Sequence, residues 1–241
     1  MRTSGCAALL GLLLSAPPVG AQQYDLRTFS LEQGLPSAAV NDLCEDAEGF
    51  LWVATDQGVA RGQGLRFEAY GRAHGLPGDE VTALLPHSDG TLWLGLRNGM
   101  LAVWSNGAIT PWDGTGLPRH PVRALLPDGA GGLWLASRGG GIWRIAAGER
   151  QARPLNDGLP ALRINALAQQ PGGPLLAATD SGLVVLQGER WQPVPVPALP
   201  SSRVLALFAD SLGVLAGTDK GYLELDNALR PLPVEQRFAG H

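Results

Sequence analysis

Charged and amide side chains gather in short polar segments between the apolar runs of this chain. Arginine, asparagine and aspartate side chains can hydrogen-bond sugar hydroxyls or carboxylates. We expect them to form a polar ligand-binding surface, with an ordinary hydrated rim as the alternative. The candidates are Asp56, Gln57, Arg97, Asn98, Arg119, His120, Arg138, Arg163, Asp180, Arg203, Asp219 and Lys220.

Signals of catalysis are weak. None of the four histidines has the spacing of a metal site or a recognisable nucleophile beside it. Asp46 and Asp89 precede turn glycines, so they are expected to form turns rather than a catalytic carboxylate pair. We therefore expect no catalytic residue, no metal and no cofactor in this chain.

Composition and charge narrow the partners. The chain has 241 residues, a formal net charge of −4 and a pI near 5.5. It has no overall basic field to hold nucleic acid or an anionic membrane, so neither is expected as a partner.

The N-terminus predicts export. Arg2, the apolar run 7–14 and the small residues up to Ala21 match a signal peptide over residues 1–21. The apolar run is too short for a transmembrane helix, which needs about 20 residues. Cleavage would leave Cys44 as the one cysteine, so no disulfide within the chain is expected.

A repeat organises the remainder. The tripeptide GLP begins at 34, 75, 116 and 158 and ALP begins at 198, so the steps are 41, 41, 42 and 40 residues. Each copy has a β-branched residue six positions on, a large apolar slot seventeen or eighteen positions on, and a glycine six positions after that slot. The β-branched residues are Val40, Val81, Val122, Ile164 and Val204; the slots are Trp52, Trp93, Trp134, Leu176 and Leu215; the glycines are Gly58, Gly99, Gly140, Gly182 and Gly221.

Each copy reads as four short strands. In the first copy, strands are expected in 38–46, 50–55, 59–62 and 66–70, separated by turns rich in Gly, Asp and Asn. A period near 41 with four strands per unit predicts an all-β fold, the β-propeller, with five visible blades. The propeller domain covers 22–241, with blades at about 33–73, 74–114, 115–156, 157–196 and 197–235.

The tryptophan slot has two interpretations. One is an aromatic platform for a ligand. The other, which we favour, is a core residue that fills the space between adjacent blades, because leucine replaces tryptophan in two copies. The glycine after the slot fits a tight turn with positive φ.

The pattern GLP-x3-V followed by D-x-x-G-x-LW-x-x-T-x-x-G resembles the two-component regulator propeller repeat. The match is closest over residues 32–59 and weakest in the fifth copy. The resemblance implies a periplasmic sensor domain, in which propellers precede a membrane span and a histidine kinase or diguanylate cyclase, and some members sense saccharides. A small-molecule or oligosaccharide ligand and a receptor dimer follow as expectations, and contact with the membrane only through segments downstream of this chain.

Counting strands suggests a larger ring. Residues 24–30 read as the outer strand of an earlier blade, yet residues 229–235 already supply one for the fifth. We expect the N-terminal part of a ring of about seven blades; a closed five-bladed ring is the alternative. A free-standing exported propeller, acting as a lyase- or glycosidase-type enzyme or as a protein-interaction scaffold, is the alternative to the sensor.

Overall fold

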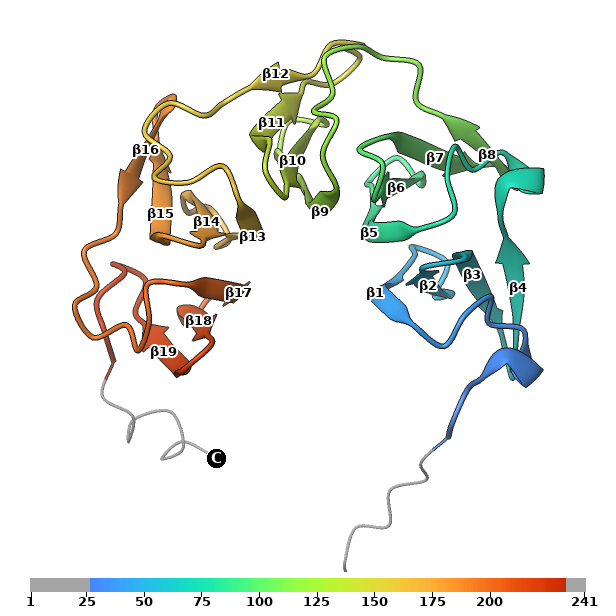
Figure 1. Cartoon of the computed structure of the whole chain (residues 1–241), viewed down its shortest axis with the longest axis horizontal. Helices are drawn as coiled ribbons and strands as arrows, with labels where there is room; N and C mark the ends of the chain where they lie inside the picture. The colour runs from blue at the N-terminus through green and yellow to red at the C-terminus, as the bar shows by residue number, and fades with distance from the viewer. Residues whose placement is uncertain (1–26, 233–241) are drawn as a thin grey trace, which may run out of the picture.

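The computed structural model describes residues 27–232, whose regular structure is almost entirely β-strand. Nineteen strands of this part form five antiparallel sheets, set side by side around a common axis (Figure 1). The predicted all-β propeller architecture with five visible blades is confirmed. The signal peptide expected at 1–21 lies outside the described residues.

The blades follow one another along the chain. Blade 1 contains β1 (Val40–Glu45), β2 (Leu51–Thr55), β3 (Gly58–Gln63) and β4 (Arg66–Tyr70). Blade 2 contains β5 (Val81–Pro86), β6 (Leu92–Leu96), β7 (Leu101–Ser105) and β8 (Ala108–Pro111). Blade 3 contains β9 (Val122–Pro127), β10 (Leu133–Ser137), β11 (Gly141–Ile145) and β12 (Arg153–Pro154). Blade 4 contains β13 (Ile164–Gln169), β14 (Leu175–Thr179), β15 (Gly182–Gln187) and β16 (Arg190–Pro193). Blade 5 contains β17 (Val204–Ala209), β18 (Val214–Thr218) and β19 (Gly221–Leu225). Two short 3₁₀ helices, η1 (Leu31–Gln33) and η2 (Arg72–His74), precede β1 and β5.

Within each blade the strands pair in chain order, and the first strand lies nearest the axis (Figure 1). Blade 5 differs from the expectation, because its sheet has three strands. Of the outer strand expected at 229–235, residues 229–232 form only an isolated bridge between Leu225 and Pro231, and 233–235 lie outside the described residues.

The described blades form an open arc and not a closed ring (Figure 1). Residues 27–30 are not in a strand and do not pair with β19. Phe29 instead packs edge-on against Phe67 of β4, with ring centroids 5.3 Å apart. A closed five-bladed ring is therefore absent from residues 27–232.

The tryptophan slot lies between blades, as predicted. Trp52 is fully buried in a cluster with Val81, Leu92 and Leu94 of blade 2. Trp93 packs against the cluster between blades 2 and 3, and Trp134 belongs to the cluster between blades 3 and 4. The slot therefore places a large apolar side chain in each of these three joints, and full burial of such a side chain contributes about 1.5–3 kcal/mol.

A β-bulge interrupts every innermost strand directly after its β-branched first residue. In three blades the bulged residue forms a hydrogen bond to the next blade. Asn41 Nδ2 donates to the Val81 carbonyl at 2.9 Å and Thr82 Oγ1 donates to the Val122 carbonyl at 2.7 Å. Asn165 Nδ2 makes the equivalent bond to the Val204 carbonyl at 2.7 Å. We call this bond the clasp.

The two end blades expose apolar side chains whose counterparts are buried elsewhere. Leu43 of blade 1 is 56% exposed, whereas its counterparts Leu84 and Leu125 are buried against a preceding blade. On blade 5, Phe208 is 57% and Tyr222 is 55% exposed. Both occupy positions that face a following blade in blades 1 to 4. Each end of the arc therefore presents half of an inter-blade joint.

Candidate functional site

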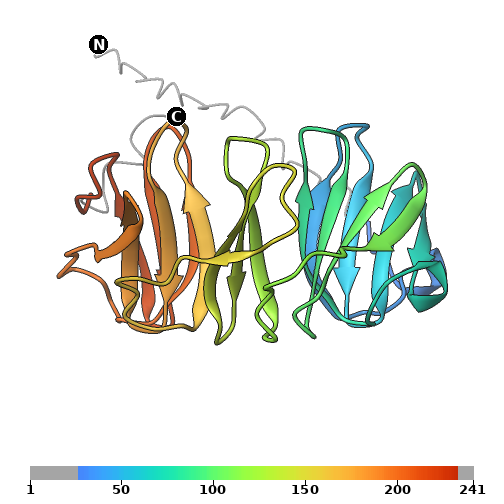
Figure 2. The ribbon, with the colours of Figure 1, turned by 90° about the horizontal axis from the view of Figure 1, so that it is seen from above.

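The predicted binding residues lie where the second strand turns into the third and where one blade crosses to the next. Antiparallel pairing brings these segments to the same end of the sheet, and we call that side of the disc the loop face. Figure 2 shows the strands crossing the thickness of the disc, with loops gathered at its two faces. Backbone bonds join the two kinds of segment: Arg97 N donates to Glu80 O at 3.0 Å, and Arg138 N to Pro121 O at 2.9 Å.

The turns on the loop face are of two lengths. In blades 1, 4 and 5 the turn sequence is Thr-Asp-x-Gly, where x is any residue. The threonine hydroxyl donates a hydrogen bond to the glycine carbonyl and accepts one from the backbone amide of residue x. In blades 2 and 3 the turn is one residue longer and begins with Arg97 or Arg138. The repeat therefore has a short aspartate turn in three blades and a longer arginine turn in two adjacent ones.

The longer turn corrects one prediction about glycine. Gly58, Gly99, Gly182 and Gly221 have positive φ, as expected. Gly140 does not; in blade 3 its neighbours Gly139 and Gly141 have positive φ instead, at 122° and 77°. Gly141, and not Gly140, pairs with Ser137, because the extra residue shifts the strand start by one position.

Blades 1 and 2 bring five of the polar loop-face residues together. Asp56 and Gln57 face Asp79, Arg97 and Asn98 across a shallow groove. One carboxylate oxygen of Asp56 is shielded from solvent and has no hydrogen-bond partner. Asn98 Nδ2 donates to the Pro77 carbonyl at 3.1 Å, which fixes its side chain in the groove.

Some charges on this face are already compensated. Arg97 Nη1 lies 2.6 Å from Glu80 Oε1. In blades 4 and 5, Arg163 and Arg203 both pair with Asp180, at 3.3 and 3.4 Å. A hydrogen bond from Asn165, with the charges of both arginines, holds the pKa of Asp180 below its usual value.

The other candidates are placed more loosely. The His120 ring packs on blade 3, where a Cβ added to Gly139 would lie 3.1 Å from Nδ1. Arg119 and Arg138 have no carboxylate partner in residues 27–232. The side chains of Asp219 and Lys220, exposed on blade 5, likewise have no hydrogen bond or ion pair there.

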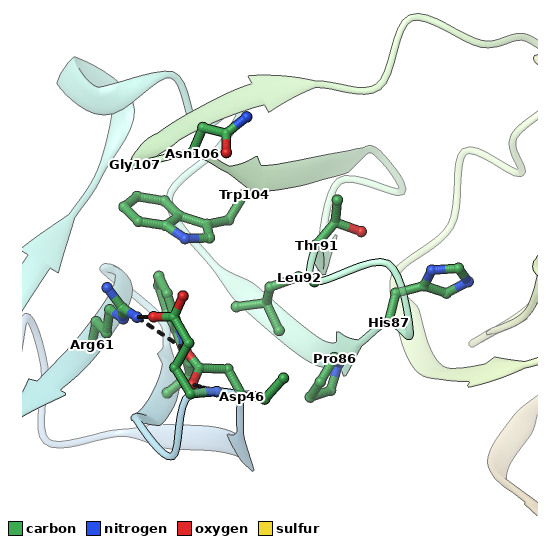
Figure 3. Close-up of a pocket in the computed structure, with 13 residues that line it drawn as sticks. Asp46, Arg61, Pro86, His87, Thr91, Leu92, Trp104, Asn106 and Gly107 are labelled. Atoms are coloured by element: carbon green, nitrogen blue, oxygen red, sulfur yellow. Dashed lines mark hydrogen bonds and ion pairs between the residues drawn. The ribbon is translucent and has the colours of Figure 1, made fainter.

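A second groove, which the sequence analysis missed, opens between blades 1 and 2 on the opposite face (Figure 3). Arg61 Nη2 lies 3.3 Å from Asp46 Oδ2 and 2.6 Å from Glu48 Oε2. Trp104 closes the other side, while His87 points away from the groove (Figure 3).

Asp46 is a turn former, as predicted. It accepts hydrogen bonds from the amides of Glu48 and Phe50 and from the Trp52 indole. Burial works against its ionisation, but these bonds and the Arg61 charge together lower its pKa. Blade 3 repeats the arrangement with Asp128, Arg144 and Trp134. The repetition indicates that this groove is mainly a product of the scaffold.

The described residues offer little for covalent or metal chemistry. Burial, followed by the charges of Asp42 and Asp46, raises the pKa of Cys44 to about 12, so its thiol stays protonated at neutral pH. Residues 27–232 contain no cluster of His, Cys, Asp and Glu side chains with the geometry of a metal site. No helix in that range is long and apolar enough to cross a membrane.

A protein-family model, described as two component regulator propeller, matches residues 34–57 and 75–98. These two segments are two-component regulator propeller repeats. They contain the GLP tripeptide, the bulged first strand and the loop-face turn of blades 1 and 2. The predicted resemblance is confirmed. No curated protein sequence matches the chain.

Several solved structures have the same fold as this chain. The extracellular domain of the putative hybrid two component system BT3049 from B. thetaiotaomicron superimposes with a TM-score of 0.73 at 18% identity, over 86% of this chain and 31% of that one. The corresponding domain of BT4673 gives 0.69 at 19% identity, over 81% and 27%. Virginiamycin B lyase from Staphylococcus aureus gives 0.59 at 14% identity, over 78% and 70%. The chain thus spans about a third or less of the length of these two extracellular domains.

Proposed function

We propose that this regulator propeller is the ligand-sensing part of an exported signal-transduction receptor. The observation that carries the proposal is the division of each repeat into a constant frame and a variable turn. Strands, bulges and joints recur from blade to blade, while the side chains presented at the loop face change. Binding residues are commonly carried on loops held by such a rigid scaffold.

The receptor context rests on the repeat family and on the extracellular domains of two component systems that share the fold. We infer a periplasmic location, reached through the leader at 1–21, and an output module of histidine kinase or diguanylate cyclase type in the same receptor. In this proposal the chain binds a small molecule or oligosaccharide and does not catalyse a reaction.

The experiment is a thermal-shift screen of the full chain against oligosaccharides and small metabolites, followed by calorimetry on each hit. We expect a ligand whose affinity falls in the double variant Asp56→Ala, Asn98→Ala. Glu45→Ala, an exposed carboxylate outside the loop face, is the matched control. Failure of every compound to shift the transition would count against the sensor.

A second candidate is a lyase-type enzyme, favoured by the fold shared with virginiamycin B lyase. It would need an acid or base at the loop face, and of the described histidines His120 is in that position. His74 Nδ1 accepts the Gly71 amide at 3.0 Å, and His87 lies 3.0 Å from Asp89. Turnover of a screened compound that is lost in His120→Ala would replace the sensor proposal with this one.

A further inference from the structure

Blade 3 departs from the other blades at the bulge. The position that carries Asn41, Thr82 and Asn165 in the clasps of blades 1, 2 and 4 holds Arg123 in blade 3. Arg123 is exposed, and no clasp links it to Ile164, the first residue of the next innermost strand. Arg123 lies on β9, the strand of blade 3 nearest the axis (Figure 1), and its charge acts with two backbone amides against the burial that raises the pKa of Asp42 on β1.

The turn of blade 3 also lacks a compensating charge. Arg97 and Arg138 are equivalent, since each donates its backbone amide to the residue that precedes the innermost strand of its own blade. In blade 2 that residue is Glu80, which pairs with Arg97 at 2.6 Å. In blade 3 the equivalent residue is Pro121, whose side chain carries no charge and cannot form an ion pair. Arg138 is therefore left without the partner that its counterpart has.

Three arginines thus lie on or directly beside one short segment of the chain, residues 119–123. Arg119 and Arg123 lie two residues before and two residues after Pro121, whose carbonyl holds the Arg138 amide at 2.9 Å. In residues 27–232 none of the three forms an ion pair with a carboxylate.

The neighbouring blades extend this positive region. Arg138 forms an isolated β-bridge with Arg163, which shares Asp180 with Arg203. Asp180 also accepts a hydrogen bond from Asn165 Nδ2, so its carboxylate is already engaged within blades 4 and 5. We call this set the arginine sector: five arginines, two of which form ion pairs with Asp180, in a chain whose net charge is −4. Its members are Arg119, Arg123, Arg138, Arg163, Arg203 and Asp180.

We propose that the arginine sector binds a ligand that carries two or more carboxylates, either an acidic oligosaccharide or a small polycarboxylate. Arginine binds carboxylates in a planar, bidentate geometry, which suits exposed guanidinium groups that no internal partner occupies. The backbone bonds of Pro121, Arg138 and Arg163 fix where these side chains originate. This proposal rests on the proposed sensor function and names its ligand class.

The test is calorimetry on the full chain with tetragalacturonate and with citrate, and with methyl-esterified tetragalacturonate as the uncharged match. We expect at least one of the two acids to bind, the ester to bind at least about tenfold more weakly, and the affinity to fall with added salt. Arg123→Gln and Arg138→Gln are each expected to weaken binding about tenfold. Arg66→Gln, an exposed arginine on β4 away from the axis, should leave the affinity unchanged.

A second variant separates binding from folding. Arg123→Asn restores the residue found in blades 1 and 4, so it should form a clasp to Ile164 and keep or raise the melting temperature while still losing affinity. The proposal is overturned if neither acid binds, if the ester binds equally, or if Arg66→Gln weakens binding as much as Arg123→Gln.

The two proposals fail in distinguishable ways. Binding of neutral oligosaccharides without either acid would overturn the arginine sector and leave the sensor intact. Conversely, acid binding that depends on Arg123 supports the arginine sector, and the sensor is then tested by transcription in cells that carry the whole receptor gene. No change in transcription on adding the bound acid would count against the sensor alone.

Discussion

The indole nitrogen of Trp52 donates to the Asp46 carboxylate at 2.8 Å, so the residue that fills the joint between blades 1 and 2 is tied to the first turn of its own blade. The same carboxylate receives the amides of Glu48 and Phe50 and pairs with Arg61 on β3. One side chain thus connects a turn, a strand pair and an inter-blade core.

Replacing the Asp46 carboxylate should weaken the turn, the strand pair and the inter-blade core that it connects. We expect Asp46→Ala to lower the free energy of unfolding by about 1–3 kcal/mol, because buried donors lose their acceptor. Urea unfolding followed by tryptophan fluorescence measures the loss. Glu45→Ala, an exposed neighbour, should change stability by less than about 0.5 kcal/mol. Equal effects of the two variants would contradict the assigned role of Asp46.

Acid should destabilise the chain partly through Asp128. Burial opposes ionisation of this carboxylate, but the amides of Ala130 and Gly132 and the Arg144 guanidinium outweigh burial and lower its pKa. A lowered folded-state pKa gives stability that is present above about pH 4 and is lost as the pH falls through the folded value.

Asp128→Asn should therefore destabilise the protein at pH 7 and flatten the fall in melting temperature below about pH 4. Thermal unfolding between pH 7 and pH 2 tests both effects. Asp113→Asn removes an exposed ion pair with Arg150 and should leave the pH profile unchanged. An Asp128→Asn profile parallel to that of the unmodified protein would show that this carboxylate does not contribute.

The slot of Trp52 should accept leucine better than alanine, because blade 4 fills the same slot with Leu176. We expect Trp52→Ala to cost about 3–5 kcal/mol in unfolding free energy and Trp52→Leu clearly less. Equilibrium unfolding of both variants in urea gives the comparison. A leucine variant as unstable as the alanine variant would favour a specific role for the indole.

The exposed end of blade 5 should promote self-association. Phe208 and Tyr222 occupy positions that the next blade covers elsewhere in the arc, so serine at both should reduce association of the chain. Size-exclusion chromatography with light scattering over a concentration series measures this. Leu65→Ser, at an exposed hairpin tip of blade 1, is the control and should have little effect.

The repeat made the scaffold predictable from sequence. Markers such as Val81 and Trp93 recur at fixed distances; Val81 packs in the joint with the preceding blade and Trp93 in the joint with the following blade. The extra residue in the turn of blade 3 was not predictable, because Gly140 fits the expected spacing and stands between two further glycines, Gly139 and Gly141. Which of them starts the strand depends on its pairing with Ser137.

The contacts of the candidate site residues were predictable only in part, for a related reason. Arg97 was selected as a loop residue, but its pairing with Glu80 depends on the crossing that approaches the turn. Arg123 was missed because it follows a β-branched residue and reads as part of a strand. A comparison of the position seven residues after each GLP, occupied by Asn41, Thr82, Arg123 and Asn165, would have singled it out.

The clasp also bears on how such a chain can grow and diversify. Its acceptor is a main-chain carbonyl, which every copy of the repeat supplies whatever its side chains. A duplicated blade therefore needs no matched mutation in its neighbour to be joined, and a donor can be given up at the cost of a single hydrogen bond, about 1 kcal/mol. A propeller assembled in this way can convert one joint after another into recognition surface while the rest of the ring keeps its shape.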